Sequence, residues 1–324
     1  MKRLLVLGMA LLIFAPAVFA DDANVMPARV GRLYLAPSYI FGSQSFDEDG
    51  NRVESADIKM LNLGVALEYG INSWITGAVQ WTPGINLWSE VDAGLPFPGD
   101  AYIKDMGDLF VGAKLQIVGP AAPVRSTGIR LAFAPGVKIP MPGPDFGDEL
   151  QSAMSGGDLT VATLDKHVLG AGLRSYIDFV INENFFINLF NEFIYYPLPG
   201  DLRNNSAYLA LAALGASGDT EVNYGFDLTF ELEPAFTFDL APGVRLNAGL
   251  PVNYKLAPQP DIDMLIFPDP ELTHLLTVKP GASIFFMGWA LPMEFKLAYH
   301  LPVWGQYSTA NNVVNFQWRV YFRI

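Results

Sequence analysis

The chain of 324 residues has no cysteine, little charge, and no long apolar run beyond its first twenty residues. Without cysteine it cannot form disulfides, which fits a cell-envelope protein better than a small secreted scaffold. No interior segment reaches the ~18 consecutive apolar residues of a transmembrane helix. Asp, Glu, Lys and Arg make up 16% of the chain, whereas soluble proteins carry about 25%. A wall with a lipid-facing side would show such a deficit.

The sequence is also poor in catalytic signals. It has three histidines, at positions 167, 274 and 300, and no HExxH motif, no phosphate-binding glycine loop, and no Ser–His pair with the spacing of an outer-membrane phospholipase. We therefore expect no enzymatic activity, no metal and no cofactor. The net charge of −13 argues against a nucleic-acid partner.

The amino terminus resembles a secretory signal peptide. Lys2 and Arg3 are followed by an apolar core from Leu4 to Phe14 and by Val18-Phe19-Ala20, which has small residues at the two key cleavage positions. The apolar run is shorter than the ~20 residues of a spanning helix. We expect residues 1–20 to be removed and residues 21–324 to form the mature protein.

Half of the chain is apolar, yet residues 222–238 alternate strictly between apolar and polar side chains. Such a period of two places one set on each face of a strand. The segment is longer than the ~10 residues of ordinary globular strands. It suits a barrel wall that crosses a membrane, and the alternative is a long strand in a soluble sandwich or lipocalin-like barrel.

Similar alternation recurs along the chain, and long connections alternate with short ones. Bacterial outer-membrane barrels have an even strand number, short periplasmic turns and longer external loops. We therefore predict an all-β, antiparallel transmembrane β-barrel of about 12 strands in the bacterial outer membrane. The predicted strands are 31–42, 58–69, 73–82, 106–117, 128–139, 167–181, 185–197, 222–238, 244–256, 274–286, 291–303 and 312–324.

The last predicted strand carries alternating aromatic residues up to the carboxyl terminus. This pattern resembles the signal that the barrel assembly machinery recognises, although the final residue is Ile324 instead of Phe or Trp. Outer-membrane lipid and the assembly machinery are therefore expected partners.

The polar face of each strand would line the lumen, where both signs of charge occur. These side chains either brace the barrel as ion pairs or select the solute that passes. The pore-lining candidates are Arg130, Arg174, Asp227, Glu231, Glu233, Arg245, Lys255, Lys296 and His300.

Several predicted external loops are apolar, and residues 206–216 are helix-forming. Exposed apolar patches usually mark binding sites, so these side chains could capture a hydrophobic solute. They could equally pack on one another as a lid, or touch lipid. The capture candidates are Trp88, Phe97, Leu209, Leu211, Leu214 and Phe267.

The run from Arg29 to Trp74 carries a family resemblance. A strand, the turn Phe46-Asp47-Glu48-Asp49-Gly50, a second strand and Tyr69-Gly70-Ile71-Asn72-Ser73-Trp74 resemble the start of the outer-membrane transporters named for the phenol meta-degradation pathway. That family is related to the FadL type of long-chain fatty-acid channels. The resemblance implies passive uptake of hydrophobic compounds. The short stretch between Ala20 and the first strand leaves no room for a full amino-terminal plug.

Together these features predict an outer-membrane channel for small, hydrophobic solutes of the fatty-acid or aromatic type. The alternative is a surface-exposed structural or adhesive barrel without transport activity. The contents of the lumen distinguish the two, because a continuous path favours transport.

Overall fold

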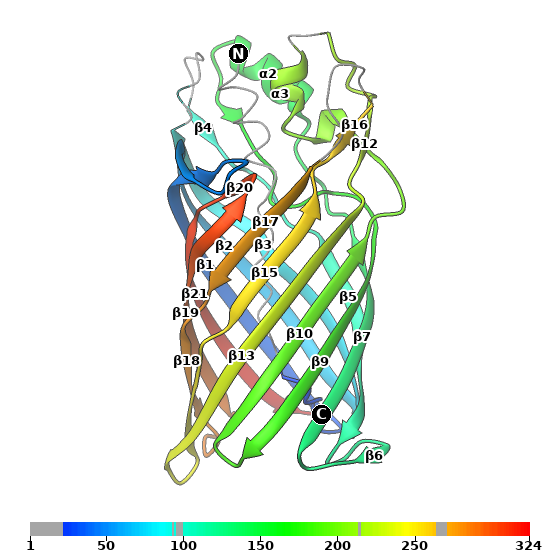
Figure 1. The fold of residues 1–324 in the computed structure, drawn as a ribbon, viewed down its shortest axis with the longest axis vertical. Coiled ribbons are helices and arrows are strands. Elements are labelled where there is room, and N and C mark those ends of the chain that lie inside the picture. The colour runs from blue at the N-terminus through cyan, green and yellow to red at the C-terminus, as the bar shows by residue number, and fades with distance from the viewer. Residues whose placement is uncertain (1–21, 93, 95–99, 213–214, 264–270) are drawn as a thin grey trace.

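The computed structural model describes residues 22–92, 94, 100–212, 215–263 and 271–324, which form a closed antiparallel β-barrel (Figure 1). The wall has twelve strand positions, as predicted. Two positions each contain two consecutive strands, separated at Leu250-Pro251 and Lys279-Pro280, because proline has no N–H for the ladder. In order the wall consists of β1 (Val30–Phe46), β2 (Arg52–Asn72), β3 (Ile75–Asp92), β5 (Leu109–Gly119), β7 (Ile129–Ile139), β9 (Gly170–Asn182), β10 (Phe185–Tyr195), β13 (Phe226–Ala241), β14 (Val244–Gly249) with β15 (Val252–Pro258), β17 (Leu272–Val278) with β18 (Gly281–Phe286), β19 (Met293–Gln306) and β21 (Asn312–Arg323).

The barrel closes where the last wall strand meets the first. β21 pairs with β1 from Val30↔Arg323 to Phe41↔Asn312, and β1 pairs with β2 on its other side. The remaining wall strands pair with their neighbours in chain order. Every wall strand therefore has a hydrogen-bonding partner on each side, which is what a bilayer demands of a β structure.

The alternating residues of each strand lie on two faces of the wall, with the polar set toward the lumen and the apolar set on the outer surface. In β13, Phe230 and Leu232 are 47% and 46% exposed on the outer surface, whereas Glu231 between them is 3% exposed. Phe193 and Leu189 of the neighbouring β10 share the outer face. An outer surface of this kind fits lipid, and the polar side chains are left to the lumen.

Most of the loops are sorted as predicted, with exceptions at both ends of the barrel. β9 joins β10, and β13 joins β14, through two-residue periplasmic turns. The first external connection, predicted as a long loop, is instead a hairpin of residues 47–51. The Asp47 carboxylate accepts hydrogen bonds from the backbone N–H groups of Asp49 and Asn51 at 3.0 and 2.8 Å, so it stabilises this turn. The periplasmic connection of residues 120–128 is longer than the others and carries β6 (Val124–Arg125).

The third strand is longer than predicted. We expected it to end at Thr82, before Pro83-Gly84, but β3 continues to Asp92 and still pairs with β2, as in Ile58↔Val91. A local bulge absorbs the Pro-Gly step. Gly84 has φ +80°, and an added Cβ there would lie 1.9 Å from the Leu63 carbonyl oxygen, so only glycine fits.

The external end of the barrel is covered by folded loops (Figure 1). No helix in the described part of the chain is long and apolar enough to cross a membrane. The predicted helix within residues 206–216 is confirmed as a four-residue helix. The smaller external elements are β4 (Ala101–Tyr102), α2 (Phe146–Met154), β8 (Leu159–Thr160), β11 (Gly200–Asp201), η1 (Leu202–Asn204), α3 (Tyr208–Leu211), β12 (Glu221–Asn223), β16 (Asp261–Ile262) and β20 (Ser308–Thr309).

The two faces of β13 should tolerate charge very differently. Leu232→Arg places a cation in lipid near the middle of the strand and should cost ~2–4 kcal/mol in the free energy of unfolding. Thr229→Asn, which keeps a polar side chain on the inner face, should cost much less. Urea unfolding of the barrel in lipid vesicles measures both, and equal losses would contradict the assignment of faces.

Candidate functional site: the barrel lumen

Charged side chains on the inner face are joined in pairs. Lys279 Nζ and Asn253 Nδ2 both donate to Glu231 Oε2, each at 2.9 Å. The side chains of Lys279 and Glu231 are only 5% and 1% exposed. Arg319 Nη1 lies 3.2 Å from Glu294 Oε2. Further pairs are Arg32–Glu68, Arg130–Asp178 and Arg174–Glu192. Each pair joins residues on different strands, so the pairs brace the wall from within.

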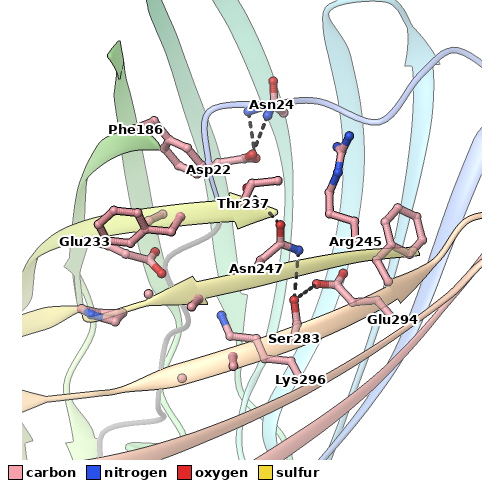
Figure 2. Close-up of a pocket in the computed structure, with 18 of the residues that line it drawn as sticks. Asp22, Asn24, Phe186, Glu233, Thr237, Arg245, Asn247, Ser283, Glu294 and Lys296 are labelled. Carbon is pink, nitrogen blue, oxygen red and sulfur yellow. Dashed lines mark hydrogen bonds between the residues drawn. The ribbon is translucent and has the colours of Figure 1, made fainter. Parts of the chain in front are cut away.

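A cavity of about 560 Å³ occupies the periplasmic half of the lumen (Figure 2). Polar side chains form a hydrogen-bonded chain along its wall. Thr237 Oγ1 donates to Asn247 Oδ1 at 3.0 Å, and Asn247 Nδ2 donates to Ser283 Oγ at 3.1 Å. Ser283 Oγ in turn donates to Glu294 Oε1 at 2.6 Å. These hydrogen bonds run from β13 to β19, so this part of the cavity wall is polar and ordered.

Most of the predicted pore-lining residues meet at this cavity. Those that line it are Arg130, Glu231, Glu233, Arg245, Lys296 and His300. Arg245 also pairs with Asp239 at 2.9 Å, in an exposed position near the periplasmic turn.

The other three candidates lie higher in the barrel. Arg174 is buried beside Glu192, and Lys255 shares its register with the inward-facing Thr229. Asp227 lies at the external end of β13, where Lys166 of an external loop pairs with it at 2.6 Å.

The start of the described chain enters the lumen. Ala23 is fully buried there, and its N–H donates to the Asp178 carboxylate at 3.1 Å. Gln116 Nε2 donates to the Ala23 carbonyl at 3.0 Å, and Lys114 Nζ donates to the Asp22 carbonyl at 2.9 Å. The stretch is too short to fill the barrel. Nevertheless, wall side chains hold it against the inner face beside the cavity.

The external end of the lumen is closed by apolar side chains. Ile58 and Met60 point inward from β2 and pack with Leu159 and Leu164 of the loop between β7 and β9. All four are at most 2% exposed. We call residues 140–169 the β7–β9 loop. This loop therefore reaches from its own strands to the inner face of β2, and loops and wall share one apolar core.

The three capture candidates among the described residues, Trp88, Leu209 and Leu211, lie in three different places. Leu211 is buried in a second apolar cluster with Leu202 and Tyr224, and Leu209 packs against the first cluster. Trp88 is 47% exposed and lies on β3 opposite the outward-facing Leu61, so its placement in a loop was wrong. Phe97, Leu214 and Phe267 lie outside the described residues. The described leucines therefore follow the lid alternative.

A polar cluster inside the external mouth was not predicted from the sequence. Asp105, Asp165, Lys166 and His167 lie in loops yet are largely buried, and they pair with one another or with the wall. A period-two pattern cannot find loop residues. The signal that could have found them is the charged run Asp165-Lys166-His167 within an otherwise apolar stretch.

No family model and no curated protein matches the chain. Among solved structures, an outer membrane channel from Pseudomonas putida F1 is similar over 94% of this chain and 100% of that one, with a TM-score of 0.64 and 13% identity. A Pseudomonas aeruginosa FadL homologue gives 0.37 and 10% over 98% and 96% of the two chains. The NanC porin gives a TM-score of 0.42 and 8% identity over 90% of this chain and 100% of that one.

At these identities the first likeness shows a shared fold. Together with the apolar outer surface and the closed ladder, it confirms the predicted class, an outer-membrane β-barrel of a bacterium.

Removing a buried lumen charge should destabilise the barrel. Glu231→Gln leaves the Lys279 ammonium without its carboxylate and should cost about 3 kcal/mol in the free energy of unfolding. The exposed pair of Arg245 and Asp239 supplies the control, because Asp239→Asn should cost less than about 1 kcal/mol. Urea unfolding in vesicles compares the two. If conductance occurs and Glu231→Gln changes its ion selectivity but not stability, the residue selects solute and does not brace.

Proposed function

We propose that this protein is an outer-membrane channel for the passive uptake of small, hydrophobic solutes of the fatty-acid or aromatic type. The observation that carries the proposal is the cavity of about 560 Å³ in the periplasmic half of the lumen. An interior space of this size can hold a small molecule. The similar Pseudomonas putida protein is an outer membrane channel, and we extend that role to this chain.

The preference for hydrophobic solutes rests on the external closure. To reach the lumen from outside, a solute must displace the buried apolar cluster of Ile58, Met60, Leu159 and Leu164, and the charges near it are already paired with one another. Transfer of apolar area out of water stabilises such an encounter by about 25 cal/mol per Å². A charged or sugar-like solute would lose its hydration there without compensation.

The same proposal assigns the chain its route to the membrane. Residues 1–20 act as the signal peptide, and the barrel assembly machinery inserts the mature chain into outer-membrane lipid. The aromatic alternation of β21, with Trp318 exposed on the outer face, is the feature that the machinery would read.

Uptake by purified protein in liposomes tests the function. Vesicles with the barrel should take up toluene or oleate faster than protein-free vesicles, and should take up glucose no faster. Equal entry of glucose would replace the proposal with a general pore. No protein-dependent entry of any solute, from a barrel shown to be folded, would favour the surface-protein alternative.

The absence of native cysteine allows the route to be mapped. Asn247→Cys places a thiol in the cavity, and modification with a charged methanethiosulfonate should reduce uptake of the apolar solute. Leu250→Cys, which lies 47% exposed on the outer face of the same wall position, is the matched control and should be insensitive. Unchanged uptake after complete modification at position 247 would mean that the path avoids the cavity.

A further inference from the structure

Three consecutive residues fix the β7–β9 loop inside the barrel mouth. Asp165, Lys166 and His167 each bind a different part of the surrounding structure. Because consecutive side chains point in different directions, the tripeptide reaches three places around the lumen from a single point of the loop. These polar contacts define one position of the loop.

Asp165 and Lys166 attach the loop to the wall. The Asp165 carboxylate pairs with Lys138 of β7, and both side chains are at most 7% exposed. It also accepts the backbone N–H of Asp108 at 3.2 Å. Lys166 Nζ lies 2.6 Å from Asp227 Oδ1 at the external end of β13, and it stands 4.3 Å from the centre of the Tyr196 ring. The loop is thereby tied to two wall strands that are separated by β9 and β10.

His167 attaches the loop to the preceding external connection. Its Nε2 lies 3.0 Å from Asp105 Oδ2 and its Nδ1 lies 3.4 Å from Asp108 Oδ1, and all three side chains are at most 4% exposed. Nδ1 is also 2.9 Å from the Met141 carbonyl. His167 has φ +55°, a left-handed conformation that few residues other than glycine adopt. A Cβ added at Gly143 would lie 2.6 Å from the His167 ring, so the loop passes the ring closely only because this residue is glycine. The local backbone conformation therefore depends on the position of the His167 side chain.

We propose that Asp165, Lys166 and His167 form a latch that holds the β7–β9 loop in the barrel mouth, and that releasing the latch uncovers the lumen. The first part concerns the loop alone. The second part rests on the proposed channel function.

The pKa of His167 gives the latch a pH dependence. Burial lowers this pKa, but the hydrogen bonds with Asp105 and Asp108 outweigh burial and raise it from 6.5 to about 10. The charged groups that face the ring or its partners are Asp105, Asp108, Asp165 and Lys138. The protonated ring therefore stabilises the inserted loop fully below pH ~6.5. This stabilisation is lost as the pH rises through about 10.

A single thiol reports where the loop lies. Ala162 is fully buried in the cluster next to the latch, and the chain has no other cysteine, so Ala162→Cys should react slowly with a membrane-impermeant maleimide. The same sample gives a second readout, the conductance in planar bilayers. Heat modifiability on gels confirms that each variant is a folded barrel.

Two substitutions in the Ala162→Cys background release the latch at separate points. His167→Asn removes the charge while keeping a residue that tolerates the left-handed backbone. Asp165→Asn removes the partner of Lys138. Each should speed labelling by about tenfold or more, because a buried charge loses its partner. The controls make the same chemical changes elsewhere, namely His274→Asn beside Tyr254 and Asp239→Asn at the periplasmic end.

The outcomes separate the latch from the channel. Faster labelling with higher conductance supports both, and faster labelling without any conductance supports the latch but counts against the channel. Labelling of folded His167→Asn and Asp165→Asn at the rate of the controls would overturn the latch. If either variant fails to fold, the other decides together with Lys166→Gln, which removes the contact with Asp227 and should give the same acceleration of labelling. No such acceleration also overturns the latch.

Discussion

The closed ladder of backbone hydrogen bonds is the constraint on which the rest of the structure depends. In hydrocarbon an unpaired N–H or C=O costs several kcal/mol, so a β structure must return to its own first strand. Pairing of β21 with β1 achieves this closure. Once closed, the wall offers only two environments, lipid outside and lumen inside. The polar side chains of every wall strand are therefore gathered in one narrow space, and their mutual pairing is a consequence of the closure.

The two ends of the lumen are closed by different kinds of interaction, hydrogen bonds at the periplasmic end and apolar packing at the external end. On the periplasmic side, Asp178, Gln116 and Lys114 satisfy the backbone of the segment around Ala23, and water-accessible space remains beside it. On the external side, apolar packing excludes water and a few buried ionic contacts set the position of the loops. The first closure is a set of exchangeable hydrogen bonds, whereas the second must break an apolar core. In the proposed channel, passage of a solute is thus controlled mainly from the outside.

The wall could be predicted from the sequence because a period of two is a local property. Glu231 between Phe230 and Leu232 reveals both faces of its strand without any knowledge of neighbours. The end of β3 was missed because Pro83-Gly84 normally ends a strand, and only pairing with β2 shows that a bulge absorbs it. The lumen charges were identified, but their partners depend on register. The contacts of His167 were out of reach, because they join loops whose paths follow no periodic rule.

The external connections are unequal in length, and this has a mechanical consequence. The β1–β2 and β19–β21 connections are tight hairpins, so they contribute little cover. The β7–β9 loop begins and ends on adjacent strands, so its covalent attachment lies at one place on the rim. Its far side rests on Ile58 and Met60 of β2. A loop that is covalently attached at one side of the rim separates first from the wall on the opposite side. The wall surface that such a movement exposes first is therefore apolar. The ion pairs deeper in the barrel are exposed only by a larger movement.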